Sequence, residues 1–153
     1  KAEPLIAWPG KAGLEQKPAT RPLNPDEEAS FARGRDLYPT ICGACHQPHG
    51  YGLEGLAPPL VDSEWVAGSP DRIVRIILPG VGGPLTVLGK KTDLDMPGHA
   101  ALDDDTIAAV MTYIRRAWDH DYDPVTPDFV KQARAATDSR QSAWTEAELK
   151  KLK

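Results

Sequence analysis

Cysteine is scarce in this sequence, because only Cys42 and Cys45 occur among 153 residues. Two cysteines could form one disulfide, but a bond across two intervening residues belongs to redox motifs on a thioredoxin-like fold. The strand and helix alternation of that fold is missing here. A zinc site would need about four ligands, and no second Cys or His pair at a suitable spacing follows. The two thiols therefore indicate a function other than a disulfide or a zinc site.

Long apolar runs are also missing, and basic residues do not dominate. No segment approaches the roughly 20 apolar residues of a membrane helix, so we expect no membrane span in this chain. The net charge of −4 makes nucleic acid a poor candidate partner. No signal peptide is visible, and the opening Lys1-Ala2-Glu3-Pro4 is typical of a processed start. The absence of an export signal before this start therefore says little about where the protein works.

Helix signals dominate the sequence and predict an all-α fold. Asn24 followed by Pro25 indicates a helix that runs toward Cys42, since Asn favours the N-cap and Pro the first helical position. The strongest pattern covers Asp104 to Trp118, where apolar residues recur at helical spacing. Further helix starts are indicated by N-cap signals at Ser69, Thr126 and Thr145.

Three stretches lack a helical period. Residues 1–23, rich in Pro, Gly, Ala and Lys, predict an extended arm or linker. Residues 43–59 are dense in Gly and Pro and predict a loop, whereas residues 85–90 favour a small hairpin. The predicted organisation is an arm, a central domain over residues 24–122, and a helical extension over residues 123–153.

The segment Cys42-Gly43-Ala44-Cys45-His46 has the spacing of c-type haem attachment. Two thiols add across the two haem vinyl groups and form thioethers, and this spacing lets both sulfurs reach one edge of the macrocycle. The adjacent histidine then comes under the ring and ligates the iron. We therefore predict one covalently bound haem c with His46 as an iron ligand. Such a large group also accounts for loops that are unusually long for a compact fold.

The sixth iron ligand has five candidates: Met96, Met111, His49, His99 and His120. Met96 is favoured because it lies in a turn-like loop that can present a thioether freely. Met111 lies on the apolar stripe of a predicted helix and is better explained as core, and His49 is too close to His46 to reach the opposite face easily. His99 remains the main alternative, three residues from Met96.

The order of the CxxCH motif, Pro58-Pro59-Leu60, Met96-Pro97 and a helix with Tyr113 and Trp118 resembles a mono-haem class I c-type cytochrome. The resemblance covers roughly Pro25 to Asp119. A closer likeness is to cytochrome domains and subunits that accompany bacterial periplasmic dehydrogenases. The residues that carry this closer likeness are Tyr38, Pro58-Pro59-Leu60, Trp65-Val66, Arg72 to Arg75, Gly83-Pro84, Met111 to Arg115, Trp144-Thr145 and Glu148-Leu149.

The resemblance implies a class I cytochrome c fold and a role for each matching residue. Pro58 would accept a hydrogen bond from the ring N–H of His46. Gly34 and Tyr38 would let the first helix pack closely on the helix with Val110 and Ile114. Residues implied to line the haem are Leu60, Ile77 and Tyr113, and those implied to contact its propionates are Trp65 and Arg75.

The resemblance also implies a periplasmic, or otherwise exported, electron-transfer protein rather than an enzyme. With His46 and Met96 both on the iron, no site remains for a substrate. The expected partners are redox proteins, namely a periplasmic dehydrogenase as donor and a downstream cytochrome or oxidase as acceptor. The chain could be a free protein, a subunit or a domain of a fusion enzyme. The alternative function is a haem enzyme or sensor with an open or labile sixth site.

Overall fold

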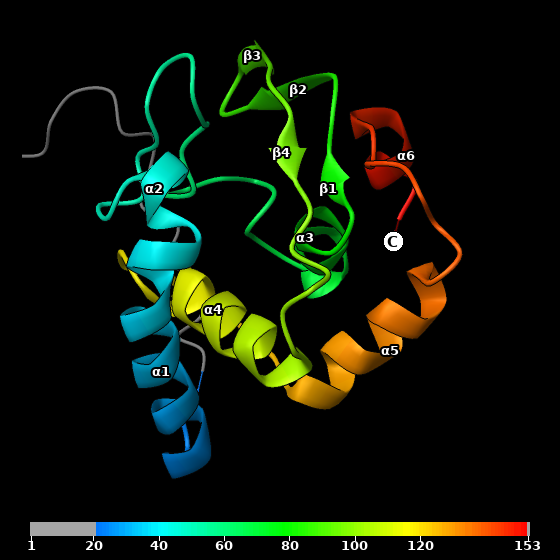
Figure 1. Ribbon diagram of the computed structural model, residues 1–153. Coiled ribbons are helices and arrows are strands. Elements are labelled where there is room, and N and C mark those ends of the chain that lie inside the picture. Colours follow the sequence, from blue (N-terminus) through cyan, green and yellow to red (C-terminus); the bar gives the residue numbers. More distant parts are fainter. Residues whose placement is uncertain (1–20, 153) are drawn as a thin grey trace, which may run out of the picture.

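The computed structural model describes residues 21–152, so the predicted arm lies outside the described residues up to residue 20. In the described part the fold is mainly helical (Figure 1). The helices are α1 (Pro25–Ile41), α2 (Gly43–His46), α3 (Pro70–Ile77), α4 (Asp104–Arg116), α5 (Pro127–Thr137) and α6 (Glu146–Lys150). No described helix is both long enough and apolar enough to cross a membrane.

The predicted helix starts are confirmed by side-chain caps. Asn24 and Glu27 form a reciprocal capping box at the start of α1, as do Thr145 and Glu148 at the start of α6. The hydroxyl of Ser69 accepts the backbone N–H of Asp71, and the equivalent contacts at α4 and α5 are made by Asp103 and Thr126. These boundaries were predictable because a cap depends on residues two or three positions apart.

The fold is not purely helical, which corrects the all-α prediction. The strands are β1 (Gly80–Val81), β2 (Pro84–Val87), β3 (Lys90–Asp93) and β4 (Met96–Pro97). The predicted hairpin is β2–β3, and its turn residues Leu88 and Gly89 both have positive φ. Such a turn matches the twist of a two-stranded antiparallel sheet. The second sheet joins β1 to β4, with Val81 opposite Met96, and had no local sequence signal because its strands have two residues each.

Helices α1 and α4 cross closely at Gly34. A Cβ at this position would collide with the backbone carbonyl of Ala109, so only glycine allows the approach. Tyr38, one turn further along α1, is buried and contacts the rings of Tyr113 and Trp118. The crossing therefore fixes the end of α1, which leads directly into the CxxCH segment.

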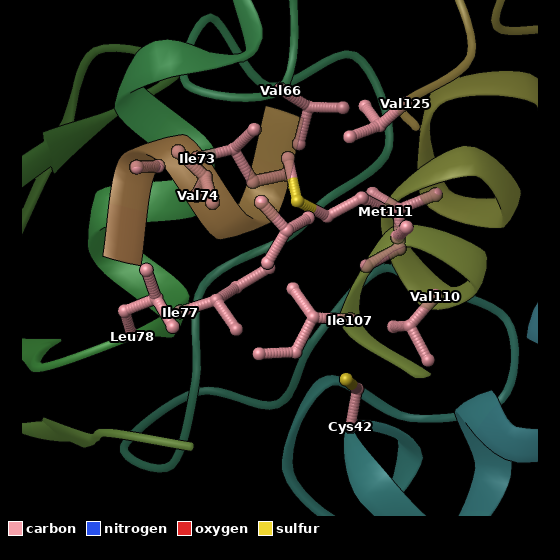
Figure 2. Packing of buried hydrophobic residues seen from close by; sticks show 14 of the residues in the cluster. Cys42, Val66, Ile73, Val74, Ile77, Leu78, Ile107, Val110, Met111 and Val125 are labelled. Atoms are coloured by element: carbon pink, nitrogen blue, oxygen red, sulfur yellow. The ribbon is translucent and has the colours of Figure 1, made fainter. Parts of the chain in front are cut away.

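The main hydrophobic core lies between α3, α4 and α5. Figure 2 shows the Met111 side chain directed among apolar residues of several elements. A second, smaller cluster joins the β2–β3 hairpin to the C-terminal helix α6. Met96 packs against both clusters, so β4 lies where the two cores meet.

Candidate haem site

The CxxCH residues form a single helical turn directly after α1. The prediction of a loop over residues 43–59 was therefore wrong for residues 43–46, whereas residues 47–59 contain no helix or strand. The backbone N–H groups of Cys45 and His46 both donate to the carbonyl of Cys42, at 3.2 and 2.9 Å. Cys42 is buried and Cys45 is exposed, so one sulfur lies inside the domain and the other at its surface.

The thiol of Cys42 is not an activated nucleophile. Burial raises its pKa to about 12, with a smaller contribution from Cys45. Reactive and redox-active cysteines instead have lowered pKa values. Among residues 21–152, no group of three or more His, Cys, Asp or Glu side chains could hold a metal ion. The structure therefore gives no support to a zinc site or a thiol redox pair.

The imidazole of His46 is held in one orientation by Pro58. Its Nδ1 lies 2.9 Å from the carbonyl oxygen of Pro58. Since a carbonyl only accepts hydrogen bonds, Nδ1 carries the proton and Nε2 keeps a free lone pair. Burial lowers the pKa of His46, partly opposed by this hydrogen bond. A neutral imidazole with one oriented lone pair is the form in which histidine binds a metal.

An apolar cavity with an empty volume of about 930 Å³, including its open mouth, lies beside the CxxCH turn. Eight predicted site residues line it, namely Cys42, Cys45, His46, Pro58, Leu60, Trp65, Ile77 and Met96. Its apolar walls fit a macrocycle, and the thiols and imidazole of the CxxCH turn, which line the same cavity, fit covalent attachment. A haem at this place would hide apolar surface that is otherwise open to water.

Met96 is the only one of the five candidate sixth ligands that lines this cavity. Figure 1 shows that α2, which carries His46, and β4, which carries Met96, come from separate parts of the fold. Met111 is fully buried in the main core, and His49 is exposed and contacts Tyr51. Met96 can therefore approach a haem in the cavity, whereas the core packing of Met111 keeps it away.

The other two histidines also lie outside the cavity lining. The ring of His120 is buried, and its Nε2 accepts the backbone N–H of Asp62 at 2.9 Å. Its Nδ1 lies 2.7 Å from the carbonyl of Ile114, so both ring nitrogens are engaged. His99 is half-buried, and its backbone N–H donates to Ile77.

Arg75 and Tyr113, which were predicted to contact the haem, do not line the cavity. The guanidinium of Arg75 is paired with Asp71, one turn earlier on α3, at 2.7 Å. Tyr113 packs against Phe31, Tyr38 and Trp118 instead. Trp65 does line the cavity, but its indole N–H donates to the carbonyl of Thr86 at 2.8 Å.

Several lining residues had not been recognised from the sequence. Leu85 and Val87 are the inward-facing residues of β2, and Val81 and Pro97 come from the β1–β4 sheet. Alternation of buried side chains along β2 was the one available signal. The contribution of β1 depends on pairing with a strand far along the chain, which no local pattern reveals.

A turn with two cysteines and an oriented neutral histidine, next to an apolar cavity that also holds a methionine, defines the class of proteins with covalently attached haem. The family model described as "Cytochrome C oxidase, cbb3-type, subunit III" matches residues 29–114. Two proteins named cytochrome c-552, both from Thermus thermophilus, are 35% identical to the chain over 130 residues. The match covers 79% of this chain, and 97% and 86% of the two relatives.

The chain therefore belongs to the c-type cytochromes, as a mono-haem class I member that carries one covalently bound haem c with its iron. Members of this family are electron carriers, and this chain transfers electrons as a c-type cytochrome.

Proposed function

We propose that the haem of this chain is a closed, six-coordinate site that moves single electrons between redox proteins. Cys42 and Cys45 would form the two thioethers, and His46 and Met96 would ligate the iron. The observation that carries the proposal is that Met96, alone among the five candidate sixth ligands, lines the cavity with His46. The bound haem supplies one-electron chemistry between Fe(II) and Fe(III).

The protein side chains set the conditions for this chemistry. A thioether ligand favours the ferrous state and raises the reduction potential. The apolar walls act in the same direction, since they disfavour the extra charge of the ferric state. The hydrogen bond from His46 to Pro58 keeps the imidazole in place during electron transfer. With two protein ligands, no coordination position is left for a substrate.

Electrons would enter and leave near Cys45, the exposed cysteine of the turn. Three large apolar side chains of the following loop are also exposed, namely Tyr51, Leu53 and Leu56. Leu56 lines the haem cavity itself, so this patch reaches the cavity wall. A small apolar surface of this kind suits weak, transient docking, which lets a redox partner leave after each transfer.

The proposed partners are a periplasmic dehydrogenase as donor and a downstream cytochrome or oxidase as acceptor. The resemblance of sequence motifs supports the dehydrogenase. The description of the matching family, a subunit of a cytochrome oxidase, supports an oxidase as acceptor. C-type cytochromes are typically exported, which supports a periplasmic location. Pull-down and electron-transfer assays with proteins encoded by neighbouring genes would test these assignments.

The ligand proposal is tested by visible spectroscopy of the haem-loaded protein and of two variants, Met96→Leu and His99→Leu. Ferric protein with methionine on the iron is low-spin and shows a weak absorption band at the red edge of the spectrum. We expect Met96→Leu to lose this band and to have a lower reduction potential than the wild type. His99→Leu should keep the band and the wild-type potential. A high-spin ferric wild type without the band would overturn the proposal and favour a haem enzyme or sensor.

A further inference from the structure

The segment that follows α5, residues 138–152, packs against β1 and β2, and β1 in turn pairs with the strand that carries Met96. We infer that this C-terminal segment is a positioning element for the sixth iron ligand: it keeps the Met96 strand closed against the haem cavity. The inference rests on the proposed ligation by Met96. Three kinds of contact support it: backbone hydrogen bonds to β1, apolar packing by Leu149, and polar contacts of several side chains.

Backbone hydrogen bonds connect the C-terminal segment to β1, and β1 pairs with the strand of Met96. The N–H of Trp144 donates to the carbonyl of Gly80, and the N–H of Gly82 donates to the carbonyl of Trp144, both at 2.9 Å. Trp144 thereby forms a parallel bridge to Val81. Val81 is also the residue opposite Met96 in the β1–β4 sheet. Strand β1 is therefore held between Trp144 on one side and the Met96 strand on the other.

The apolar packing is provided by Leu149 of α6, which is fully buried. It belongs to the second cluster, whose other buried members are Trp65, Ile76, Val81, Leu85 and Val87. All five of these residues line the haem cavity, whereas Leu149 does not. Met96 packs against the same cluster. Leu149 therefore supports the cavity wall from behind, on the side that supplies the methionine.

Polar contacts fasten this segment at several points. The Glu146 carboxylate accepts the backbone N–H of Thr86 in the hairpin at 3.2 Å, and Arg72 of α3 donates to the carbonyl of Leu152 at 3.3 Å. The guanidinium of Arg140 lies 3.7 Å from the centroid of the Trp144 ring and pairs with Glu148 at 2.8 Å. The segment is thus tied to β2 and α3 as well as to β1.

These contacts matter because β4 has little stability of its own. It contains two residues, and Pro97 has no N–H to donate to a ladder. Short segments with few contacts open locally at a small cost in free energy. An opening of β4 would move Met96 away from the cavity, so contacts that hold β1 and its apolar backing reduce how often the methionine leaves the iron.

The test compares Leu149→Ala with Val61→Ala, a control that also truncates a buried residue but belongs to neither cluster against which Met96 packs. Two quantities are measured on haem-loaded protein: the rate of imidazole binding to the ferric form at saturating imidazole, and global unfolding in guanidinium. The rate at saturation reports how often Met96 leaves. We expect Leu149→Ala to raise this rate by at least about tenfold, because the lost packing lowers the free-energy cost of opening β4 locally.

The control should lower global stability and leave the imidazole rate within about twofold of wild type, because it leaves the opening of β4 unaffected. An equal change in rate for both variants, or none for Leu149→Ala, would overturn the inference. Leu149→Val provides a milder variant with an intermediate expected rate if the alanine variant does not fold. The wild-type spectrum keeps the two proposals apart: a missing methionine band refutes ligation by Met96, whereas a wild-type band with an unchanged variant rate refutes only the positioning role.

Discussion

Tyr38 illustrates how one buried polar side chain serves the haem site. Its ring packs at the α1–α4 crossing, and its hydroxyl donates to the carbonyl of Gln47 at 2.9 Å. Gln47 directly follows His46 and has a positive φ of 64°, which L residues rarely adopt. Burial raises the pKa of Tyr38, so the hydroxyl stays protonated and remains a donor. The side chain thus holds the exit of the CxxCH turn in a conformation that it would not favour alone.

Removal of this hydroxyl should therefore destabilise the protein. We expect Tyr38→Phe to lower the free energy of unfolding by about 1–2 kcal/mol, because the Gln47 carbonyl loses a buried donor. The measurement is guanidinium unfolding of the haem-loaded protein. Tyr51→Phe is the matched control, since Tyr51 is 64% exposed and should change stability by less than about 0.5 kcal/mol. Equal effects of the two variants would contradict the role given to Tyr38.

At the scale of elements, the site depends on how closely α1 approaches α4. Gly34 permits this approach, and the end of α1 then delivers Cys42 to the cavity. We expect Gly34→Ala to destabilise the protein by about 3 kcal/mol, because the clash with the Ala109 carbonyl outweighs the roughly 1 kcal/mol gained in helix propensity. The adjacent and exposed Arg35→Ala is the control. A thermal melt that shows Gly34→Ala as stable as wild type would refute the close crossing.

The attachment of α6 should depend on pH through Glu148. Its hydrogen bonds to Arg140 and to the backbone of Thr145 lower its pKa from 4.5 to about 2. A carboxyl whose pKa is lowered on folding stabilises the folded state above its unfolded pKa. This contribution is lost as the pH falls from about 4.5 to about 2.

We therefore expect hydrogen exchange at the Leu149 amide to quicken below about pH 4.5, after correction for intrinsic exchange. Glu148→Gln should be less protected at neutral pH and should lose most of this pH dependence. A variant that keeps the wild-type pH profile would mean that a different group controls α6.

For the whole molecule, the haem is part of the hydrophobic core. The cavity between the turn of His46 and the β1–β4 sheet is lined mostly by apolar residues. A chain made without haem, such as the double variant Cys42→Ala and Cys45→Ala, would expose this surface to water. We expect it to lose cooperative unfolding and most fixed tertiary packing while it keeps part of its helix content. Near-ultraviolet circular dichroism measures the loss of fixed tertiary packing, and far-ultraviolet circular dichroism measures the helix content that remains. A haem-free chain that unfolds cooperatively with native helix content would contradict this prediction.

The sequence by itself was sufficient where the physical cause is local. The helix starts at Asn24 and Thr145 follow from capping interactions within one turn, and haem attachment follows from five consecutive residues. The two-residue turn of the β2–β3 hairpin is local in the same sense. These features need no knowledge of distant segments, because the interacting groups are neighbours along the chain.

Tertiary structure decided what depends on contacts between distant residues. The sequence favours Met96 as the sixth ligand but leaves His99 open, and of the two only Met96 lines the cavity, because β4 pairs with β1. Arg75 pairs with Asp71 on its own helix and does not line the cavity. The support that Trp144 and Leu149 give to the methionine strand also has no local signature, since it arises from a bridge between segments more than sixty residues apart. The CxxCH segment thus predicts the haem, whereas long-range strand pairing places Met96 at the cavity in which we propose that the haem binds.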